Sequence, residues 1–390
     1  MSCPPVLSYQ ASLGFDPSAC AFPRPRWPLL PRWQAGHWAW RAAPELQARG
    51  GWQSYSRARY ALRAALAAAG VSPGSRVLAP AYHCRTLIDP ALALGAEVLL
   101  YPLTHTLQPL ADALEPALQA ANAPKALVLT HFLGQALPDE VLSHWVERAH
   151  ARGIAVVEDC SHLCIPALWR DPKVLAGRAG DYAVASHYKF FAGSDGAALW
   201  WQAGRAAPAT PRSGGIWAGL KGLAATLDPR QPPPLAGTTQ ASLGEDRRIP
   251  AAQLSPHYRP EHEGQRALWS SDRLRRHTRL DALVARRRAH YAAWDALAAT
   301  LQRGRPLWSS QPAVPYAYPL LLDAPVAERF ARLKRQGLPM WRWDDMAVSG
   351  CPVAQDFRLR LVHLPCHQSL SEADMAAMTS LVRAELGAAA

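Results

Sequence analysis

Residues 181–201, DYAVASHYKFFAGSDGAALWW, decide the fold that we predict for this chain. An apolar, strand-like run leads into a polar turn that carries Ser186 and Lys189, and a second apolar run follows. A lysine is unusual here, because most of the 42 lysines and arginines are arginine. The lysines are Lys125, Lys173, Lys189, Lys221 and Lys334. We therefore interpret Lys189 as a residue needed for its amine rather than for its charge.

Helix-like and strand-like segments alternate on the N-terminal side of this stretch. SRARYALRAALAAAG (56–70) has the pattern of a helix closed by a glycine, and SRVLAPAY (75–82) that of a short buried strand. The alternation continues to about residue 203. Strands that alternate with helices predict an α/β fold with a mostly parallel sheet flanked by helices.

Composition divides the chain into four segments. Residues 1–45 form a Pro- and Trp-rich arm that we expect to be extended and packed against the rest, and residues 46–203 form the large α/β domain. Residues 204–265 are too rich in Pro and Gly for regular core elements, which indicates an active-site or interface loop region. Residues 266–390 begin with one long basic helix (270–303) and continue as a small α+β domain.

The bulk composition is that of a globular protein, with 49% hydrophobic and 18% charged residues. A net charge of +12 favours an anionic partner, whether nucleic acid, anionic lipid or a phosphorylated small molecule. The helix at 270–303 could contact a nucleic-acid backbone, but its charges are typical of a solvated face and no DNA-binding module accompanies it. No apolar run is long enough to span a membrane and no leader pattern is present, so we expect a cytoplasmic protein.

The seven cysteines are odd in number and lack CxxC spacing, so we interpret them as free thiols. The motif HLPCH brings His363, Cys366 and His367 together, with Cys351 upstream, but this spacing fits no standard zinc site. We therefore predict no metal.

Three strand or helix ends carry groups suited to pyridoxal 5'-phosphate (PLP). Asp159 ends the run GIAVVED and could pair with a pyridinium nitrogen, while Lys189 could bind an aldehyde carbon. The small-residue turn before the helix at 60 could bind a phosphate through backbone N–H groups, with Ser186 adding a hydroxyl. Each residue alone is more often a turn or solvated residue. Their joint occurrence in this order favours the cofactor.

The ordered motifs resemble the DegT/DnrJ/EryC1/StrS family of sugar aminotransferases, which are PLP enzymes of fold type I. The matching segments are SRARYAL, SPGSRVLAPAYHC, THFLGQALP, VVEDCSH, the GD at 180–181, SHYK, SDGA and VHLPCHQSLSEADM. The resemblance runs from about residue 50 to 385. It implies the aspartate aminotransferase-like fold with a small C-terminal α+β domain, and a homodimer with its sites near the subunit boundary.

The resemblance also implies roles for individual residues. Lys189 matches the lysine that binds the cofactor, and Asp159 the carboxylate that pairs with its ring nitrogen. His162 matches the residue beside the phenolic oxygen. Ala58 and Arg59 fall on the phosphate-binding turn, which Ser186 supports.

Some positions depart from the family pattern. The aromatic residue that usually stacks on the pyridine ring falls at Cys84, which leaves Tyr82 and His83 as candidates for stacking. The family's second glycine after the lysine is Ala197, and the GYN segment that reaches the neighbouring subunit's phosphate has no counterpart.

The resemblance therefore implies an aminotransferase that moves an amino group, expected from glutamate, to a keto sugar. We expect a nucleotide-linked sugar from polysaccharide or secondary-metabolite biosynthesis. The alternatives are a PLP enzyme that does not transaminate and a non-catalytic binding or regulatory protein derived from the family. Lys189 argues against the sugar dehydratases of the family, which carry histidine at that position.

Overall fold

The computed structural model describes residues 5–14, 22–46, 50–227, 247–251, 253–323 and 327–387. Their strands are β1 (Leu7–Ser8), β2 (Ala11–Gly14), β3 (Gly51–Tyr55), β4 (Arg76–Pro80), β5 (Glu97–Tyr101), β6 (Ala126–Thr130), β7 (Ala155–Asp159), β8 (Tyr182–Ala185), β9 (Ala197–Trp201), β10 (Arg247–Pro250), β11 (Gly304–Pro306), β12 (Ala317–Leu322), β13 (Met346–Ala347) and β14 (Leu361–Pro365). Their α-helices are α1 (Ala58–Ala68), α2 (Asp89–Leu92), α3 (Ala111–Gln119), α4 (Asp139–His150), α5 (Ile165–Leu168), α6 (Gly215–Leu227), α7 (Trp269–Arg276), α8 (Leu280–Ala298), α9 (Ala327–Arg335), α10 (Pro352–Arg360) and α11 (Glu372–Leu386).

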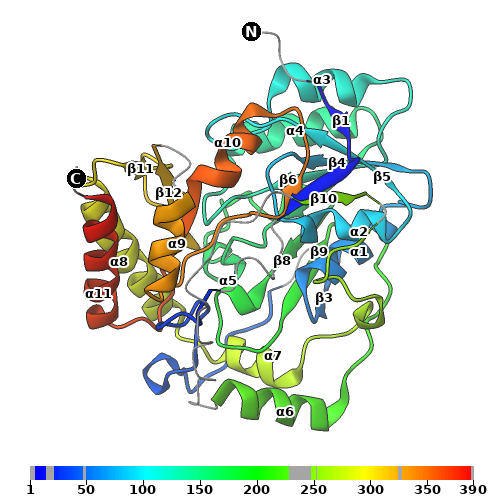
Figure 1. The fold of residues 1–390 in the computed structure, drawn as a ribbon. Coiled ribbons are helices and arrows are strands. Elements are labelled where there is room, and N and C mark those ends of the chain that lie inside the picture. Colours follow the sequence, from blue (N-terminus) through cyan, green and yellow to red (C-terminus); the bar gives the residue numbers. More distant parts are fainter. Residues whose placement is uncertain are drawn as a thin grey trace.

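The large sheet has the strand order β1-β5-β4-β6-β7-β8-β9-β3 (Figure 1). The five strands from β5 to β8 run parallel, and β1, β9 and β3 pair antiparallel with their neighbours. Every residue of β6 and β8 is buried, which explains why segments such as ALVLT are continuous apolar runs rather than alternating ones. Helices α1 and α4 pack on this sheet. The predicted mostly parallel α/β sheet is confirmed.

The C-terminal part forms its own small layer. Strands β11, β12 and β14 make an antiparallel sheet, and α8, α9 and α11 lie together on this side of the molecule (Figure 1). Apolar residues of the sheet and helices share one core, with Trp294, Tyr318 and Met378 among its buried members. Helix α11 begins with a capping box, in which Ser371 and Asp374 bind each other's backbone N–H groups. The expected small α+β unit is therefore present.

The single long helix predicted for 270–303 is wrong, because the segment forms two helices, α7 and α8. The break lies at residues 277–279, where the N-terminal arm binds. The Trp38 ring stacks on His277 with centroids 4.5 Å apart, and the Arg279 N–H donates to the His37 carbonyl. Tertiary hydrogen bonds here replace those that a continuous helix would make, and local helix propensity could not reveal them.

The segment 204–265 contains regular structure at its surface. Helix α6 buries Gly219 and Gly222, and β10 is largely exposed. Gly219 lies against the Trp269 ring, where a Cβ atom would come within 1.8 Å of the indole nitrogen. The sequence predicted no regular core element in this segment, and among its described residues Tyr258 belongs to the core. The sequence did not reveal the helix.

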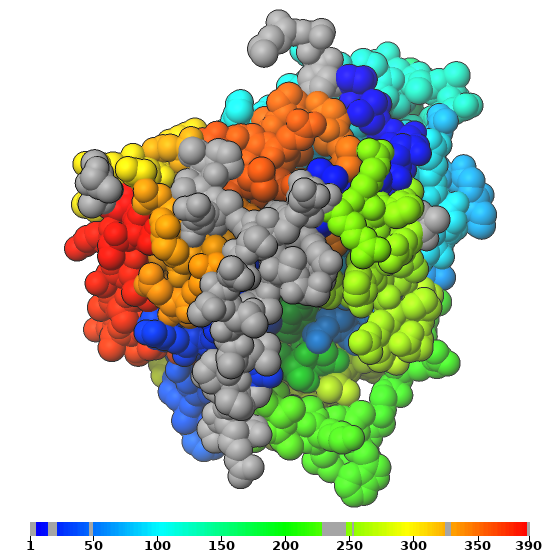
Figure 2. All heavy atoms as spheres, viewed as in Figure 1, coloured from blue at the N-terminus to red at the C-terminus, as the bar shows by residue number. Residues whose placement is uncertain are grey.

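The N-terminal arm lies against the C-terminal residues, as the blue atoms beside the red and orange ones show in Figure 2. The Arg32 N–H donates to Ser369 Oγ, and the Arg26 N–H to the Gly337 carbonyl. Near its start the chain also joins two sheets, because β1 pairs with β5 and β2 lies between β10 and β13. Among the described residues, no helix has the length and apolar character needed to cross a bilayer.

Gly134 fixes the approach of the small layer to the large sheet. Its φ is +102°, and a Cβ atom would lie 2.7 Å from the Tyr316 backbone nitrogen and 3.0 Å from the Val314 carbonyl oxygen. We expect Gly134→Ala to lower the free energy of unfolding by about 2–4 kcal/mol, since it combines backbone strain with a clash against backbone atoms. Urea unfolding followed by circular dichroism measures this change.

Gly74→Ala is the matched control. Gly74 also has a positive φ, +82°, but a Cβ atom there would meet nothing within 4 Å. Its loss should be limited to the backbone term of about 1–2 kcal/mol. Equal losses in the two variants would show that the contact with Tyr316 is not a steric constraint.

Candidate active site

The predicted site residues follow the carboxyl ends of neighbouring parallel strands. Strand β7 ends at Asp159, β8 leads into Ser186 and the 3-10 turn η3 (His187–Lys189), and β4 leads towards His83. Strands β4, β6, β7 and β8 are adjacent and parallel. Their carboxyl ends therefore meet at one edge of the sheet, where α/β folds place ligands.

A small cavity of about 40 Å³ lies at this edge. The predicted residues in its wall are Ala58, Arg59, His83, Asp159, Ser186 and Lys189. Arg57 and Tyr188, which the sequence did not assign to the site, also line it. The fold thus brings together an amine, a carboxylate and the start of helix α1 from segments far apart in sequence.

Asp159 is a buried carboxylate with one oxygen hydrogen-bonded and the other within ion-pair distance of a histidine ring. Oδ1 accepts the Ser161 N–H at 2.9 Å, and Oδ2 lies 3.3 Å from His83 Nε2. Burial alone would raise the pKa of Asp159, but His83, the Ser161 side chain and the charge of Lys189 outweigh it and lower the pKa. The group is therefore ionised at neutral pH, as a partner for a protonated ring nitrogen must be.

Lys189 is half-buried, with Nζ 5.4 Å from the centroid of the Tyr316 ring. Its backbone carbonyl accepts a hydrogen bond from Arg287 Nη2 at 3.0 Å. The fully buried Arg287 also donates to Gln368 Oε1 and to the Pro315 carbonyl, each at 2.9 Å, and Gln368 donates to the Phe190 carbonyl at 2.8 Å. Arg287 and Gln368 thus bind the turn that carries Lys189 to the C-terminal layer.

Unsatisfied polar atoms gather at the start of α1. Among the described residues, Ser56 Oγ, Arg57 Nη1 and Ser186 Oγ are buried without a hydrogen-bond partner. The first N–H groups of α1 add donors that no turn of the helix can satisfy. The Arg57 guanidinium lies 4.5 Å above the Tyr188 ring. Such a set of donors fits a phosphate group.

The remaining predicted residues lie outside the cavity wall. Tyr82 is fully buried and packs against Trp343, with ring centroids 4.7 Å apart, so its ring belongs to the core. His162 is buried, stacks on Tyr316 at 4.7 Å and runs parallel to His83, with Nδ1 unpartnered among the described residues. Cys84 is half-buried beside His83. Of the two candidates for ring stacking, only His83 reaches the cavity.

The residues of the HLPCH motif face different partners. His367 Nε2 lies 2.8 Å from the Pro28 carbonyl, while the His363 ring lies edge-on to Trp343 with centroids 5.2 Å apart. Elsewhere His131, Glu158 and Cys160 are close enough for a shared ion. Glu158 is nevertheless satisfied by the N–H groups of residues 177, 179 and 180 and by His131. We interpret it as a structural carboxylate.

Residues 54–202 match a known family model, and the match spans the whole cavity edge from Ser56 to Lys189. The model is that of the DegT/DnrJ/EryC1/StrS aminotransferase family. The match confirms the resemblance stated above and, with it, the expected class of PLP-dependent aminotransferases. No curated protein sequence matches the chain.

Several solved structures share the fold. A putative sugar aminotransferase from Streptococcus pneumoniae, in its PMP form, has a TM-score of 0.62 at 15% identity and covers 92% of this chain and 97% of its own. The Bacillus subtilis protein ntda, with bound cofactor PMP, has a TM-score of 0.59 at 14% identity, covering 86% and 73%. The aminotransferase TlmJ from Streptoalloteichus hindustanus has a TM-score of 0.56 at 20% identity, covering 86% and 85%. These similarities confirm the fold type I architecture.

The residues present fit PLP, the cofactor of this family. Asp159 offers an ionised carboxylate, Lys189 an amine, and the start of α1 with Ser186 a set of free phosphate donors. The His83 ring must move away from Asp159 Oδ2 when the cofactor binds, because it lies 3.3 Å from the oxygen that a ring nitrogen would use. Once bound, PLP would supply an electron sink for bonds at an attached amino carbon.

The burial of Arg287 was not predicted from the sequence, because the charges of this helix were assigned to a solvated face. We expect Arg287→Met to lower the free energy of unfolding by about 3 kcal/mol, because it leaves the Lys189 and Pro315 carbonyls without their donor. Urea unfolding of the cofactor-free protein measures this loss. A positioning role further predicts that Arg287→Lys, if folded, releases PLP about tenfold faster, as followed by absorbance after dilution.

Arg286→Met is the control on the same helix. Arg286 is half-buried, and its exposed ion-pair partner Glu372 lies 3.5 Å away. Its loss should stay within about 0.5 kcal/mol. If wild type and Arg287→Lys release PLP at similar rates, Arg287 stabilises the fold but does not position Lys189 for the cofactor.

Proposed function

We propose that the chain transfers an amino group, with glutamate as donor, to the keto group of a nucleotide-linked sugar. The family match supports the reaction class, and the shared wall between the Lys189 cavity and a basic pocket supports the kind of acceptor. We further propose a homodimer. The product would enter polysaccharide or secondary-metabolite biosynthesis.

In this proposal the residues in and beside the cavity have distinct roles. Lys189 Nζ would hold the cofactor and, once released from it, would carry a proton as a general acid and base. Asp159 keeps the ring nitrogen protonated, because its own pKa is held low. Ser186 and the first N–H groups of α1 hold the phosphate. His162 Nδ1, unpartnered among the described residues, would face the phenolic oxygen.

A basic pocket of about 730 Å³ adjoins the cavity and shares Arg57 and Arg59 with it. Its other basic residues are Arg212, His257, Arg259, His262 and Arg266, and the carboxylate in its wall is Asp195. Such an excess of arginine suits the two phosphates of a nucleotide diphosphate, which guanidinium groups bind in pairs. The volume lies within the range of small-molecule sites.

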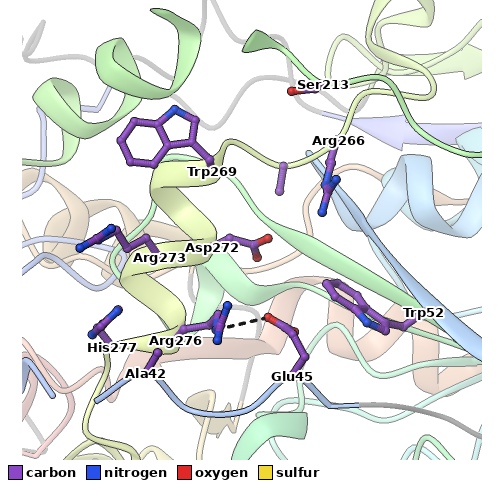
Figure 3. Close-up of a pocket in the computed structure, with 11 residues that line it drawn as sticks. Ala42, Glu45, Trp52, Ser213, Arg266, Trp269, Asp272, Arg273, Arg276 and His277 are labelled. Atoms are coloured by element: carbon purple, nitrogen blue, oxygen red, sulfur yellow. Dashed lines mark ion pairs between the residues drawn. The ribbon is translucent and has the colours of Figure 1, made fainter. Parts of the chain in front are cut away.

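A second pocket continues from Arg266 and Ser213, which it shares with the first. Figure 3 shows its wall, where Trp269 lies on the side of Arg273 and Trp52 lies across from it beside Glu45. The Arg276 side chain points to Glu45. Trp269 is 40% exposed, so its ring is accessible to a ligand. Together the pockets offer charge for phosphates and a ring for a base.

Lys189→Ala tests the proposed reaction. We expect the purified variant to lack the visible absorption band of a lysine-bound cofactor. Its rate with glutamate should fall at least about 10³-fold, because the amine that binds the cofactor and transfers the proton is gone. Lys221→Ala, at an exposed lysine of α6, should retain both. If Lys189→Ala keeps the band and the rate, the assignment of Lys189 is wrong.

Arg212→Ala and Arg259→Ala test the acceptor. Each should weaken binding of UDP about tenfold by calorimetry while the rate with glutamate stays unchanged, because each removes one charge-assisted phosphate contact. Arg152→Ala removes an exposed arginine outside both pockets and should change neither value. UDP binding no tighter than uridine binding would contradict a diphosphate site.

A further inference from the structure

Cys84 stands in a chain of three chemically coupled side chains. Its Sγ lies 3.4 Å from His83 Nδ1 and 3.0 Å from Thr86 Oγ1. The other ring nitrogen of His83, Nε2, lies 3.3 Å from Asp159 Oδ2. A nucleophile beside a base whose far side meets a carboxylate is the arrangement that activates thiols and hydroxyls in enzymes.

The charges around Cys84 favour the thiolate. Burial would raise the pKa of Cys84, but His83, Lys189 and the Thr86 hydroxyl together lower it below its usual value. Burial would likewise lower the pKa of His83, but Cys84 and Asp159 raise it. The pair is therefore favoured as thiolate and imidazolium.

The other described cysteines lack this setting. Cys160, Cys164, Cys351 and Cys366 are at most 2% exposed. Burial raises the pKa of Cys160, Cys164 and Cys366. Cys351 Sγ accepts the Ala354 N–H as the cap of α10. Cys84 alone among the described cysteines is both half-buried and paired with a histidine.

We propose that Cys84 is a reactive thiol, modified by soft electrophiles such as peroxides, and that cofactor loading suppresses its reactivity. With a peroxide, the thiolate sulfur attacks one oxygen, an S–O bond forms and the O–O bond breaks. The sulfur is oxidised to a sulfenic acid, and the peroxide is reduced to hydroxide or alkoxide, which takes up a proton.

Asp159 provides the coupling between thiol and cofactor. The oxygen that faces His83 is the one left for a ring nitrogen, since Ser161 holds the other. A cofactor on Asp159 therefore removes the group that orients and charges His83. This coupling rests on the proposed function, whereas the reactivity of the thiol in the cofactor-free protein does not.

Alkylation by iodoacetamide at pH 7, read by peptide mass spectrometry, tests both parts. The sulfur–carbon bond forms as iodide leaves, and each cysteine is scored separately, including Cys3 and Cys20, which lie outside the described residues. We expect cofactor-free wild type to be labelled at Cys84 about tenfold faster than His83→Gln. Saturating PLP should slow wild-type labelling at least fivefold.

Two controls keep the result decisive. Urea unfolding establishes that His83→Gln is folded, and Thr86→Val, which removes only the hydroxyl contact, serves as a second variant that should also slow labelling. Equal rates in wild type and both variants would overturn the activated thiol. An unchanged rate in the presence of PLP, with the visible band formed, would overturn the coupling alone. Failure of the band to form would refute the proposed function and the coupling, while the variants still decide the reactivity.

Discussion

The carboxylate of Asp159 is the constraint on which the site depends. A charge at the end of a fully buried strand is costly unless hydrogen bonds and opposite charges surround it. Here the Ser161 N–H and the His83 ring meet that need. His83 in turn brings Cys84 to the edge of the site. One buried charge thus fixes the conformation of two separate loops, one after β4 and one after β7.

The position of Lys189 depends on residues of the C-terminal layer rather than on its own strand. The turn after β8 is short, and its carbonyl groups face the C-terminal layer, where Arg287 and Gln368 donate to them. Burial lowers the pKa of Arg287 to about 10, which leaves it charged at neutral pH. Five guanidinium N–H groups in a fixed plane can bind several carbonyl oxygens at once, and a lysine ammonium cannot match that geometry. The C-terminal layer thus positions the site by binding the backbone of residues 189 and 190.

Local patterns in the sequence predicted the parts of the fold that local physics determines. Buried strands are apolar along their length and their ends carry polar residues, so the sequence alone places Asp159, Ser186 and Lys189 at one edge of the sheet. The start of α1 followed from a turn of small residues. These positions needed only chain order and the rule that parallel strands end together.

The missed features depend on residues distant in sequence. The division between α7 and α8 comes from hydrogen bonds with residues 37–43, and the burial of Arg287 comes from carbonyl groups at 189 and 315. A run of arginines has the same composition whether it faces water or a core. Likewise, the sequence could not separate Tyr82 from His83, because both rings are buried and both pack on Trp343, and only the fold shows that His83 lines the cavity while Tyr82 also packs on Phe357.

The docking of the N-terminal arm has a consequence for the order of folding. Arg32 binds Ser369 across 337 residues of chain, and Pro28 accepts a hydrogen bond from His367 across 339. During synthesis these first residues emerge long before their partners, so they must wait while the sheet and its helices form. Pro28 and Arg32 thus leave the ribosome well before the residues that bind them, and they reach their final place only when the C-terminal layer has been made.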